Sequence, residues 1–467
     1  MDSWSSWAND VFGEAQLGDC RRTTRLVWMA AQAGRHPSGR ISEVFSDDAE
    51  RQGAYDFVES RYVRADAIGR ALTASTAQRC AQQPWVYVPV DSTSIKLWDG
   101  KGTKDFGAIG TYHSGATGLK LYSALALDPS GTPLGVAGLV WWCRPRINPR
   151  LRRPSYRRPV AEKETKYLLQ CIEQVRQQME QHAPGVRCWF QLDRGCDAQS
   201  VLRQLHDSGH WFTVRAHSDR RIAASGARRW FKKTLRQQPL LGIRAIELPA
   251  REGRPARRAK LAVRSAQLTL RLHDKRTKRS SPLQLNAVLV NEIGYKGPGK
   301  IEWYLLTNCA VATLQQAWRV VQGYTQRWRI EEYYKTWKTG ACDVEDCQLH
   351  STEHVQRWAT ILSAVAARIE RLKYLARNKP DEPATVELSV DEVRALVLLH
   401  TRRKKRNEIV PHNPTIAQAT LWIAQLGGYT GRSSGGPPGS ITIARGLNEL
   451  KPAVEMFRML SPQSRMR

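Results

Sequence analysis

Residues 186–193 read Val-Arg-Cys-Trp-Phe-Gln-Leu-Asp, and this short apolar run that ends at an acid decides the fold. An apolar stretch of this length, bounded by polar residues, predicts a buried strand. A helix is expected next, at about 197–208, and a further strand at Trp211–Arg215. Strand, helix and strand in succession are typical of α/β proteins.

The segment before this run predicts more of the same sheet. Trp85–Val90 is a short apolar strand that is followed by Asp91. Two further strands are expected at Leu121–Leu127 and Leu134–Trp142, because a Pro-Ser-Gly turn separates two apolar runs. A helix rich in Glu, Gln and Lys is expected over 161–182. The sequence therefore predicts a mixed α/β sheet flanked by helices.

The pattern of charge and hydropathy changes twice in the segment after this run. Residues 217–300 are basic and alternate in hydropathy, which predicts a β-rich insertion, and Ile301–Thr307 predicts another strand. Helical patterns dominate from about 311 to the end, and also over residues 1–64. We therefore expect three domains, which are a helical one at 1–64, the mixed sheet at 65–370 and a helical one at 371–467.

The charge of the chain indicates a polyanionic partner. Among 467 residues, 72 are Lys or Arg and 43 are Asp or Glu, which gives a formal net charge of +29. Such an excess is costly for a compact chain unless a polyanion neutralises it. No apolar run approaches the ~20 residues of a membrane span. The nine cysteines follow no repeating spacing, which favours a reducing cytoplasm. Nucleic acid is therefore a better partner than a membrane.

Two acids mark the ends of predicted strands. Asp91 and Asp193 each follow an apolar strand of what we take to be one sheet. Carboxylates that converge at neighbouring strand ends can hold Mg²⁺ or Mn²⁺, because hard cations prefer oxygen ligands. The alternative, for either acid alone, is a side chain that caps the turn after its strand.

A third acid lies on the predicted helix 324–338. At helical spacing, Tyr324, Arg327, Glu331 and Lys338 share one narrow stripe, and Lys335 lies beside it. This face suits a carboxylate on a metal ion with cations that grip phosphate. The alternative is a solvated face that carries ion pairs four residues apart.

The spacing Tyr324-x2-Arg327-x3-Glu331-x6-Lys338 resembles the Y-(2)-R-(3)-E-(6)-K signature of the IS-four family of DDE transposases. The resemblance extends, in order, over Ala15–Leu26, Gln52–Phe57, Asp91–Ser94, Glu162–Thr165, Asp193–Asp197, Arg329–Glu332 and Trp337–Gly340. An ordered set of this kind over nearly the whole chain is specific.

The resemblance implies a ribonuclease-H-like catalytic core with a β-sheet insertion. Asp91, Asp193 and Glu331 would be the three catalytic, metal-binding acids, with two Mg²⁺ (or Mn²⁺) ions per site. The implied activity is cut-and-paste transposition, in which transposon ends are bound, nicked, converted to hairpins, reopened and joined by their 3′ ends to target DNA. The domain at 65–370 would be catalytic, and the DNA would be double-stranded.

The resemblance also implies DNA contacts. Tyr324, Arg327 and Lys338 would contact phosphate, with Lys335 beside them. Trp303 would receive a base flipped out of the stack, although a core aromatic in a strand is the alternative. The other expected contacts are Arg215 near the active-site DNA and Arg21, Arg22 and Arg25 in an N-terminal domain that binds the transposon end.

The C-terminal domain at 371–467 resembles the dimerisation region of the family. Within it, an apolar stripe recurs at helical spacing at Ile443, Leu447, Leu450, Val454 and Phe457. The stripe either pairs with its twin in a homodimer, which would form the synaptic complex, or packs on its own chain. Gly446 and Pro452 are expected to weaken the helix.

Two other functions stay open at this point. One is a ribonuclease-H-like nuclease without strand transfer. The other is a catalytically inactive, transposase-derived DNA-binding protein, although all three acids and the full signature are present. The expected location is the cytoplasm, at the bacterial nucleoid.

Overall fold

One large mixed sheet organises the protein. The computed structural model describes residues 2–111, 114–145, 153–223, 230–248, 255–403, 408–431 and 436–460. Ten strands pair in the order β2-β3-β1-β5-β6-β10-β9-β8-β7, with β4 beside β3. They are β1 (Trp85–Lys96), β2 (Gly107–Ala108), β3 (Thr117–Leu127), β4 (Pro133–Trp142), β5 (Arg187–Leu192), β6 (Trp211–Arg215), β7 (Gly242–Leu248), β8 (Arg257–His273), β9 (Ser280–Ile293) and β10 (Glu302–Thr307). This sheet with its flanking helices confirms the predicted fold class.

The centre of the sheet is mixed in direction. β1 is antiparallel to β3 and parallel to β5, and β5 is parallel to β6. The expectation that the first strand ends at Asp91 is wrong, because β1 continues to Lys96. The parallel pairing of β1 with β5 does stop at Val90 and Leu192, whereas the pairing with β3 continues. Asp91 is thus the first residue of β1 beyond its contact with β5.

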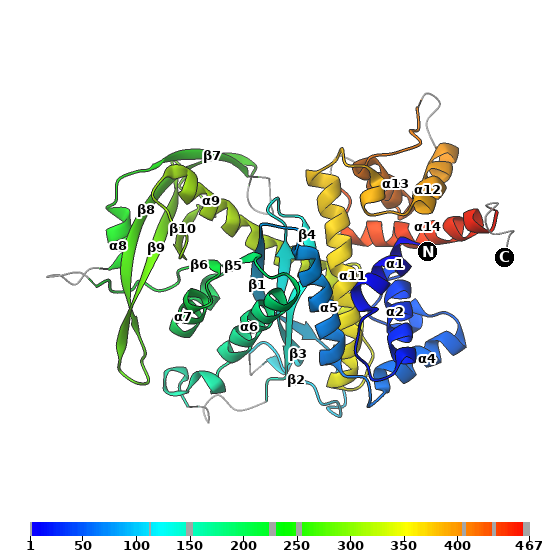
Figure 1. Ribbon diagram of the computed structural model, residues 1–467, viewed down its shortest axis with the longest axis horizontal. Coiled ribbons are helices and arrows are strands. Elements are labelled where there is room, and N and C mark those ends of the chain that lie inside the picture. The colour runs from blue at the N-terminus through cyan, green and yellow to red at the C-terminus, as the bar shows by residue number, and fades with distance from the viewer. Residues whose placement is uncertain are drawn as a thin grey trace.

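The predicted β-insertion extends this sheet. β9 pairs with β10 and with β8, and β8 pairs with β7, all antiparallel. One short helix, α8 (Phe231–Arg236), precedes these strands in sequence and packs on β8 and β9. The long β8–β9 hairpin projects from one end of the molecule (Figure 1).

Helices cover both faces of the sheet. On one face, alternate residues Val86, Val88 and Val90 of β1 join a buried cluster with α6 (Thr165–His182) and α7 (Gln199–Asp207). On the other face, Tyr87 and Trp189 join the larger cluster, which includes side chains of α9, α10 and α11. The remaining helices of this part are α5 (Ala65–Cys80), α9 (Leu314–Thr325), α10 (Arg329–Lys338) and α11 (Thr352–Asn378). This alternation is what a strand buried on both faces requires.

The N-terminal segment is helical, as predicted. It forms α1 (Ser3–Phe12), α2 (Cys20–Arg35), α3 (Ile41–Val44) and α4 (Asp48–Glu59). Asp19 caps α2, since its side chain accepts a hydrogen bond from the backbone N–H of Arg21. Short 3₁₀ turns elsewhere are η3 (Ser155–Arg157), η4 (Val160–Glu162), η5 (Arg194–Cys196), η6 (Gln326–Trp328), η7 (Val344–Asp346) and η8 (Ala384–Val386).

The C-terminal segment adds α12 (Val390–Arg403), α13 (Ile416–Leu426) and α14 (Ser440–Leu460) to the end of α11 (Figure 1). The boundary that we expected between residues 370 and 371 lies inside α11, which is one continuous helix there. α14 also continues through Pro452.

The apolar stripe of α14 packs on its own chain. Ile443, Leu447, Leu450 and Val454 are all buried without any partner subunit, and α14 contacts α11, α12, α13 and α2. This confirms the second of the two alternatives for these four side chains. The apolar side chains that α14 does expose include Ile441, Met456 and Met459.

The contact between α13 and α14 depends on Gly446. A Cβ at this position would lie 1.7 Å from the backbone oxygen of Ile423. We expect Gly446→Ala to lower the free energy of unfolding by about 2 kcal/mol, because the two helix backbones must separate. Denaturant unfolding measures the loss, and Gly69→Ala is the control, since a Cβ there meets nothing within 4 Å. Equal stability of the two variants would contradict the close contact.

Within the described residues, no helix is long and apolar enough to span a membrane.

Candidate active site

The helix expected over 324–338 is interrupted. Tyr324 lies in the last turn of α9, Arg327 lies in the 3₁₀ turn η6, and Glu331 and Lys338 lie on α10. A single continuous α-helix is therefore wrong. The tighter turn changes the direction of the side chains, because 3₁₀ geometry places three residues in a turn instead of 3.6. Arg327, which lies in this turn, reaches toward the sheet.

Arg327 joins two of the three predicted acids. One of its terminal nitrogens donates to Asp91 Oδ2 at 3.2 Å, and the other donates to Glu331 Oε1 at 2.5 Å. The Arg327 side chain is 13% exposed, so this pair of contacts is shielded from solvent. The strand acid and the helix acid, which are 240 residues apart in sequence, are thus brought to one guanidinium.

Asp193 completes the cluster. It follows β5 and caps η5, where its Oδ1 accepts from the backbone N–H of Gly195 at 2.7 Å. The pKa of Asp91 is raised to about 6, first by burial and then by the negative charge of Asp193, with a smaller contribution from Glu331. Arg327 and the backbone N–H of Ser92 oppose this rise. Two further carboxylates within electrostatic reach of a partly buried one are the arrangement that raises such a pKa.

The donor set fits a hard divalent cation. Asp91, Asp193 and Glu331 offer only carboxylate oxygens, which Mg²⁺ and Mn²⁺ prefer. In the part of the chain that the structure describes, no three Asp, Glu, His or Cys side chains stand close enough to hold an ion as they are placed. Arg327 contacts two of the three acids and supplies the positive charge among them.

Three predicted DNA-contacting residues gather beside the acids. The rings of Trp303 and Tyr324 meet edge to face with centroids 5.2 Å apart. Burial raises the pKa of Tyr324, while the charges of Arg327 and Arg215 oppose that rise, so both arginines lie close to its hydroxyl. Arg215 also donates to the backbone oxygen of Glu302 at 3.4 Å. Trp303 is only partly buried.

The two predicted lysines of α10 differ in their surroundings. Lys338 pairs with Glu345 of η7 at 3.2 Å, and Glu345 also accepts from the backbone N–H of Lys96 at 2.9 Å. This links the end of α10 to the end of β1. Lys335 is exposed to solvent.

The predicted N-terminal arginines lie apart from the acids, on α2. Arg21 and Arg25 are exposed, and Arg22 is partly buried beneath the ring of Tyr62 at 4.8 Å. α2 packs on α11, on the side of α5 and α11 that faces away from β5 (Figure 1). The structure thus separates these arginines from the acids of the same chain.

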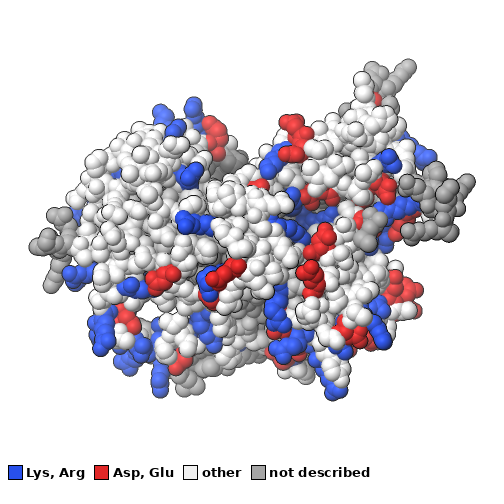
Figure 2. All heavy atoms as spheres, viewed as in Figure 1, with Lys and Arg blue, Asp and Glu red and all other residues white. Residues whose placement is uncertain are grey.

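The basic surface of the molecule extends beyond these sites. Figure 2 shows Lys and Arg side chains gathered at the lower left, where the β8–β9 hairpin ends. This turn carries Lys275, Arg276, Lys278 and Arg279, all exposed. Within the predicted basic segment at 217–300, Arg228 and Arg229 lie outside the described residues.

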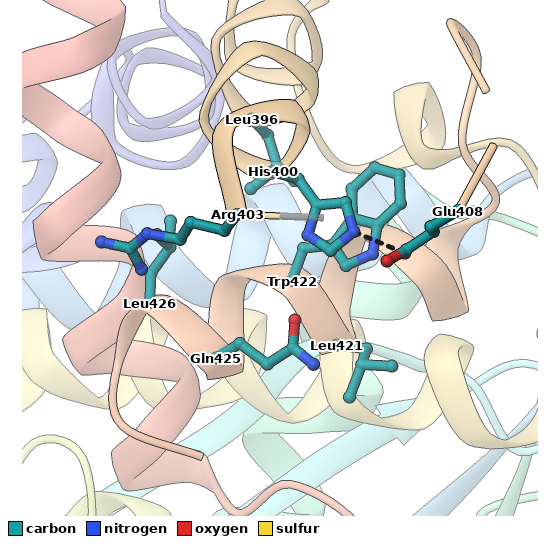
Figure 3. Close-up of a pocket in the computed structure, with 8 residues that line it drawn as sticks. All are labelled: Leu396, His400, Arg403, Glu408, Leu421, Trp422, Gln425 and Leu426. Carbon is teal, nitrogen blue, oxygen red and sulfur yellow. Dashed lines mark hydrogen bonds and ion pairs between the residues drawn. The ribbon is translucent and has the colours of Figure 1, made fainter. Parts of the chain in front are cut away.

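A well-formed hollow lies elsewhere, between α12 and α13. It has a volume of about 710 Å³ and a largely apolar lining (Figure 3). His400 stacks on Trp422 with ring centroids 4.2 Å apart, and its Nε2 lies 2.8 Å from Glu408 Oε1. None of the predicted site residues lines this hollow. The acids lie away from this hollow, and the side chains of Asp91 and Glu331 are 23% and 34% exposed.

Sequence reasoning missed three residues that support this site. Tyr334 and Ser123 hydrogen-bond to each other and Tyr334 also bonds to the backbone of Asp91, while Glu345 holds Lys338. Tyr334 follows Glu331 by three residues, so helical spacing was a signal for it. Ser123 and Glu345 give no such signal, because only the pairing of strands and the turn after α10 place them.

Three family models match successive parts of the chain. The model described as transposase DNA-binding matches residues 4–63, the transposase DDE domain matches 158–367, and the transposase Tn5 dimerisation domain matches 364–465. Asp193 and Glu331 lie within the DDE match, and Asp91 precedes it. Together the three models cover most of the chain in the order that Tn5-like transposases have. The chain therefore belongs to the DDE transposases, and is a DNA-binding, dimer-forming, metal-dependent DNA phosphoryl transferase.

Proposed function

We propose that this transposase moves DNA by a cut-and-paste route, with Asp91, Asp193 and Glu331 as its catalytic acids. The observation that carries the proposal is the contact of Arg327 with both Asp91 and Glu331 at a site where Asp193 perturbs Asp91. The route comprises a nick at the transposon end, a hairpin, its opening, and joining of the 3′ end to target DNA. In-line phosphoryl transfer requires mainly positioning and charge neutralisation, so one site can serve all four steps.

The three acids would hold two Mg²⁺ or Mn²⁺ ions. When bound, such ions activate the attacking oxygen and stabilise the leaving oxygen. The ions would then neutralise the carboxylates in place of Arg327, and the N–H groups of the Arg327 guanidinium would be available to a DNA phosphate. Lys338 and Tyr324 would add further phosphate contacts, and Lys335 is exposed on the same helix as Lys338.

The hairpin step requires a sharply bent strand. A base that leaves the stack relieves this bend and needs an aromatic surface to receive it. Trp303 suits this role because it is partly exposed. Its ring contacts Tyr324, and Arg215 lies close to the hydroxyl of that tyrosine.

The homodimer would act in trans. Arg21, Arg22 and Arg25 are separated from the acids of their own chain by α5 and α11. A DNA end that is bound on α2 of one subunit would therefore meet the acids of the other. The helical segments at 1–64 and 371–467 would serve end binding and dimerisation, on either side of a catalytic part at 65–370.

Trp303→Ala tests the hairpin role. Loss of base stacking costs about 1–3 kcal/mol, so we expect hairpin formation to slow by about tenfold while the first nick proceeds at nearly the wild-type rate. Denaturing gels of end-labelled DNA separate nicked, hairpin and opened products. Trp303→Phe keeps a ring and should retain most of the activity. An equal loss of nicking and hairpin formation in the alanine variant would contradict this role.

A further inference from the structure

Tyr334 lies buried between the strand that carries Asp91 and the helix that carries Glu331. Its hydroxyl donates to the backbone oxygen of Asp91 at 2.7 Å. The same hydroxyl lies 2.7 Å from Oγ of Ser123 on β3. Ser123 is fully buried and Tyr334 is nearly so. Tyr334 follows Glu331 by three residues on α10, and so shares its side of the helix.

The direction of these hydrogen bonds follows from the groups present. A backbone carbonyl can only accept, so the single proton of Tyr334 points to Asp91. The hydroxyl of Ser123 must then donate to the oxygen of Tyr334. The result is a buried chain that runs from Ser123 through Tyr334 to Asp91, in which each donor has an acceptor. Buried hydroxyls that are fully paired in this way fix the position of the groups they join.

The strand pairing explains why this link matters at Asp91. Asp91 pairs in register with Ser123 on β3, but it lies beyond the last pair that β1 forms with β5, Val90 and Leu192. One side of β1 therefore loses its neighbouring strand at the residue whose carboxylate forms the site. The Tyr334 hydroxyl binds the backbone of Asp91 there, and thereby fixes the distance between β1 and α10.

We propose that Tyr334 is a positioning residue that sets the separation of the Asp91 and Glu331 carboxylates for a divalent cation. This inference rests on the proposed function of those two acids. Tyr334 contacts the backbone of one acid and shares a helix with the other, so it acts through them and not on the DNA. Without this hydroxyl the protein would still carry both carboxylates, but the distance between them would vary.

The test is Mn²⁺ binding to the full-length protein without DNA, followed by the electron paramagnetic resonance signal of free Mn²⁺. We expect Tyr334→Phe to weaken Mn²⁺ binding by about tenfold, as loss of an outer-shell partner of a metal ligand commonly does. Tyr333→Phe is the matched control, because Tyr333 is its fully buried neighbour on α10 and its hydroxyl faces Ser363 of α11. The control should bind Mn²⁺ like the wild type.

The outcomes separate this inference from the proposed function. Asp91→Asn and Glu331→Gln should abolish the same Mn²⁺ binding, and wild-type binding by both would contradict the assignment of the acids. If Asp91→Asn and Glu331→Gln lose Mn²⁺ binding while Tyr334→Phe binds Mn²⁺ as tightly as Tyr333→Phe, the positioning role of Tyr334 is wrong. The assignment of the two acids as metal ligands is then still supported. Should Tyr334→Phe fail to unfold cooperatively, Ser123→Ala decides, since weaker binding supports the role and unchanged binding overturns it.

Discussion

Replacing Glu331 with Gln is expected to slow DNA cleavage by about a thousandfold, or ~4 kcal/mol of transition-state stabilisation. Gln has nearly the same size and its amide oxygen can still accept from Arg327, so α10 should keep its position. What the variant loses is the negative charge that a divalent cation requires. The effect should appear at saturating Mn²⁺ or Mg²⁺, in a single-turnover assay with end-labelled DNA.

Glu332→Gln is the matched control for this loss. Glu332 is the next residue on α10, and it pairs with Arg329 at 2.9 Å instead of with the acid cluster. This variant should cleave within about twofold of the wild-type rate, since an exposed or half-exposed ion pair contributes little. Both variants should bind the transposon end normally in EDTA. Cleavage by Glu331→Gln at the rate of Glu332→Gln would show that the third acid lies elsewhere.

Replacing Asp91 with Asn is expected to stabilise the metal-free protein at pH 7.5, by as much as about 3 kcal/mol. The folded protein raises the pKa of Asp91 from an ordinary value near 3.8 to about 6, through burial and the charges of Asp193 and Glu331. The folded state therefore holds this proton more tightly than the unfolded state does, and stability is lost as pH rises from 4 through 6. A pKa that is higher by about 2 in the folded state corresponds to ~3 kcal/mol of stability. Asn carries no charge and avoids this loss.

The measurement is denaturant unfolding in EDTA between pH 4 and pH 8. The advantage of Asp91→Asn should be greatest above pH 6 and vanish near pH 4, where the wild-type carboxyl is protonated. Asp128→Asn should have the opposite sign at neutral pH. Burial raises the pKa of Asp128, but hydrogen bonds from Ser130 and Thr132 outweigh it and hold that pKa below its ordinary value. A destabilised Asp91→Asn at pH 7.5 would contradict the clustering of the three carboxylates.

The same pKa predicts how the active site responds to pH. A cation competes with the proton on Asp91, so metal binding should weaken as pH falls below about 6. Cleavage should then require more Mn²⁺ at pH 5.5 than at pH 7.5. The local negative charge of Asp91, Asp193 and Glu331 would allow a cation to bind even though the net charge of the chain is +29.

Part of the fold was predictable because several of its strands, such as β5, β6 and β10, are short apolar runs. β6 begins and ends where the sequence predicted, and β5 and β10 each begin one residue later than expected. The failures have physical reasons. β1 continues past Asp91 because β3 still offers it a partner, and that pairing between distant segments leaves no local signal. The helix at 324–338 is interrupted at η6, where no glycine or proline marks the change.

The candidate site residues could be named from residue type and spacing, but their geometry could not be predicted. The stripe on the predicted helix placed Arg327 near Glu331, and the structure shows that Arg327 also reaches Asp91 on β1. The apolar stripe of α14 illustrates the limit of periodicity. Its spacing indicates burial but not against which chain, and only the packing of α14 on α12 and α13 resolves this.

We propose that one cluster of three acids, Asp91, Asp193 and Glu331, both cuts and joins DNA. The most direct measurement incubates the full-length protein with Mg²⁺ or Mn²⁺ and a plasmid segment flanked by the inverted ends that border its gene, and follows both excision and joining to a second plasmid. We predict hairpin-ended intermediates, released segments and joined products, all lost in EDTA and in Glu331→Gln. Nicks without hairpins or joined products would indicate a nuclease, and binding without any cleavage would contradict a catalytic role for the three acids.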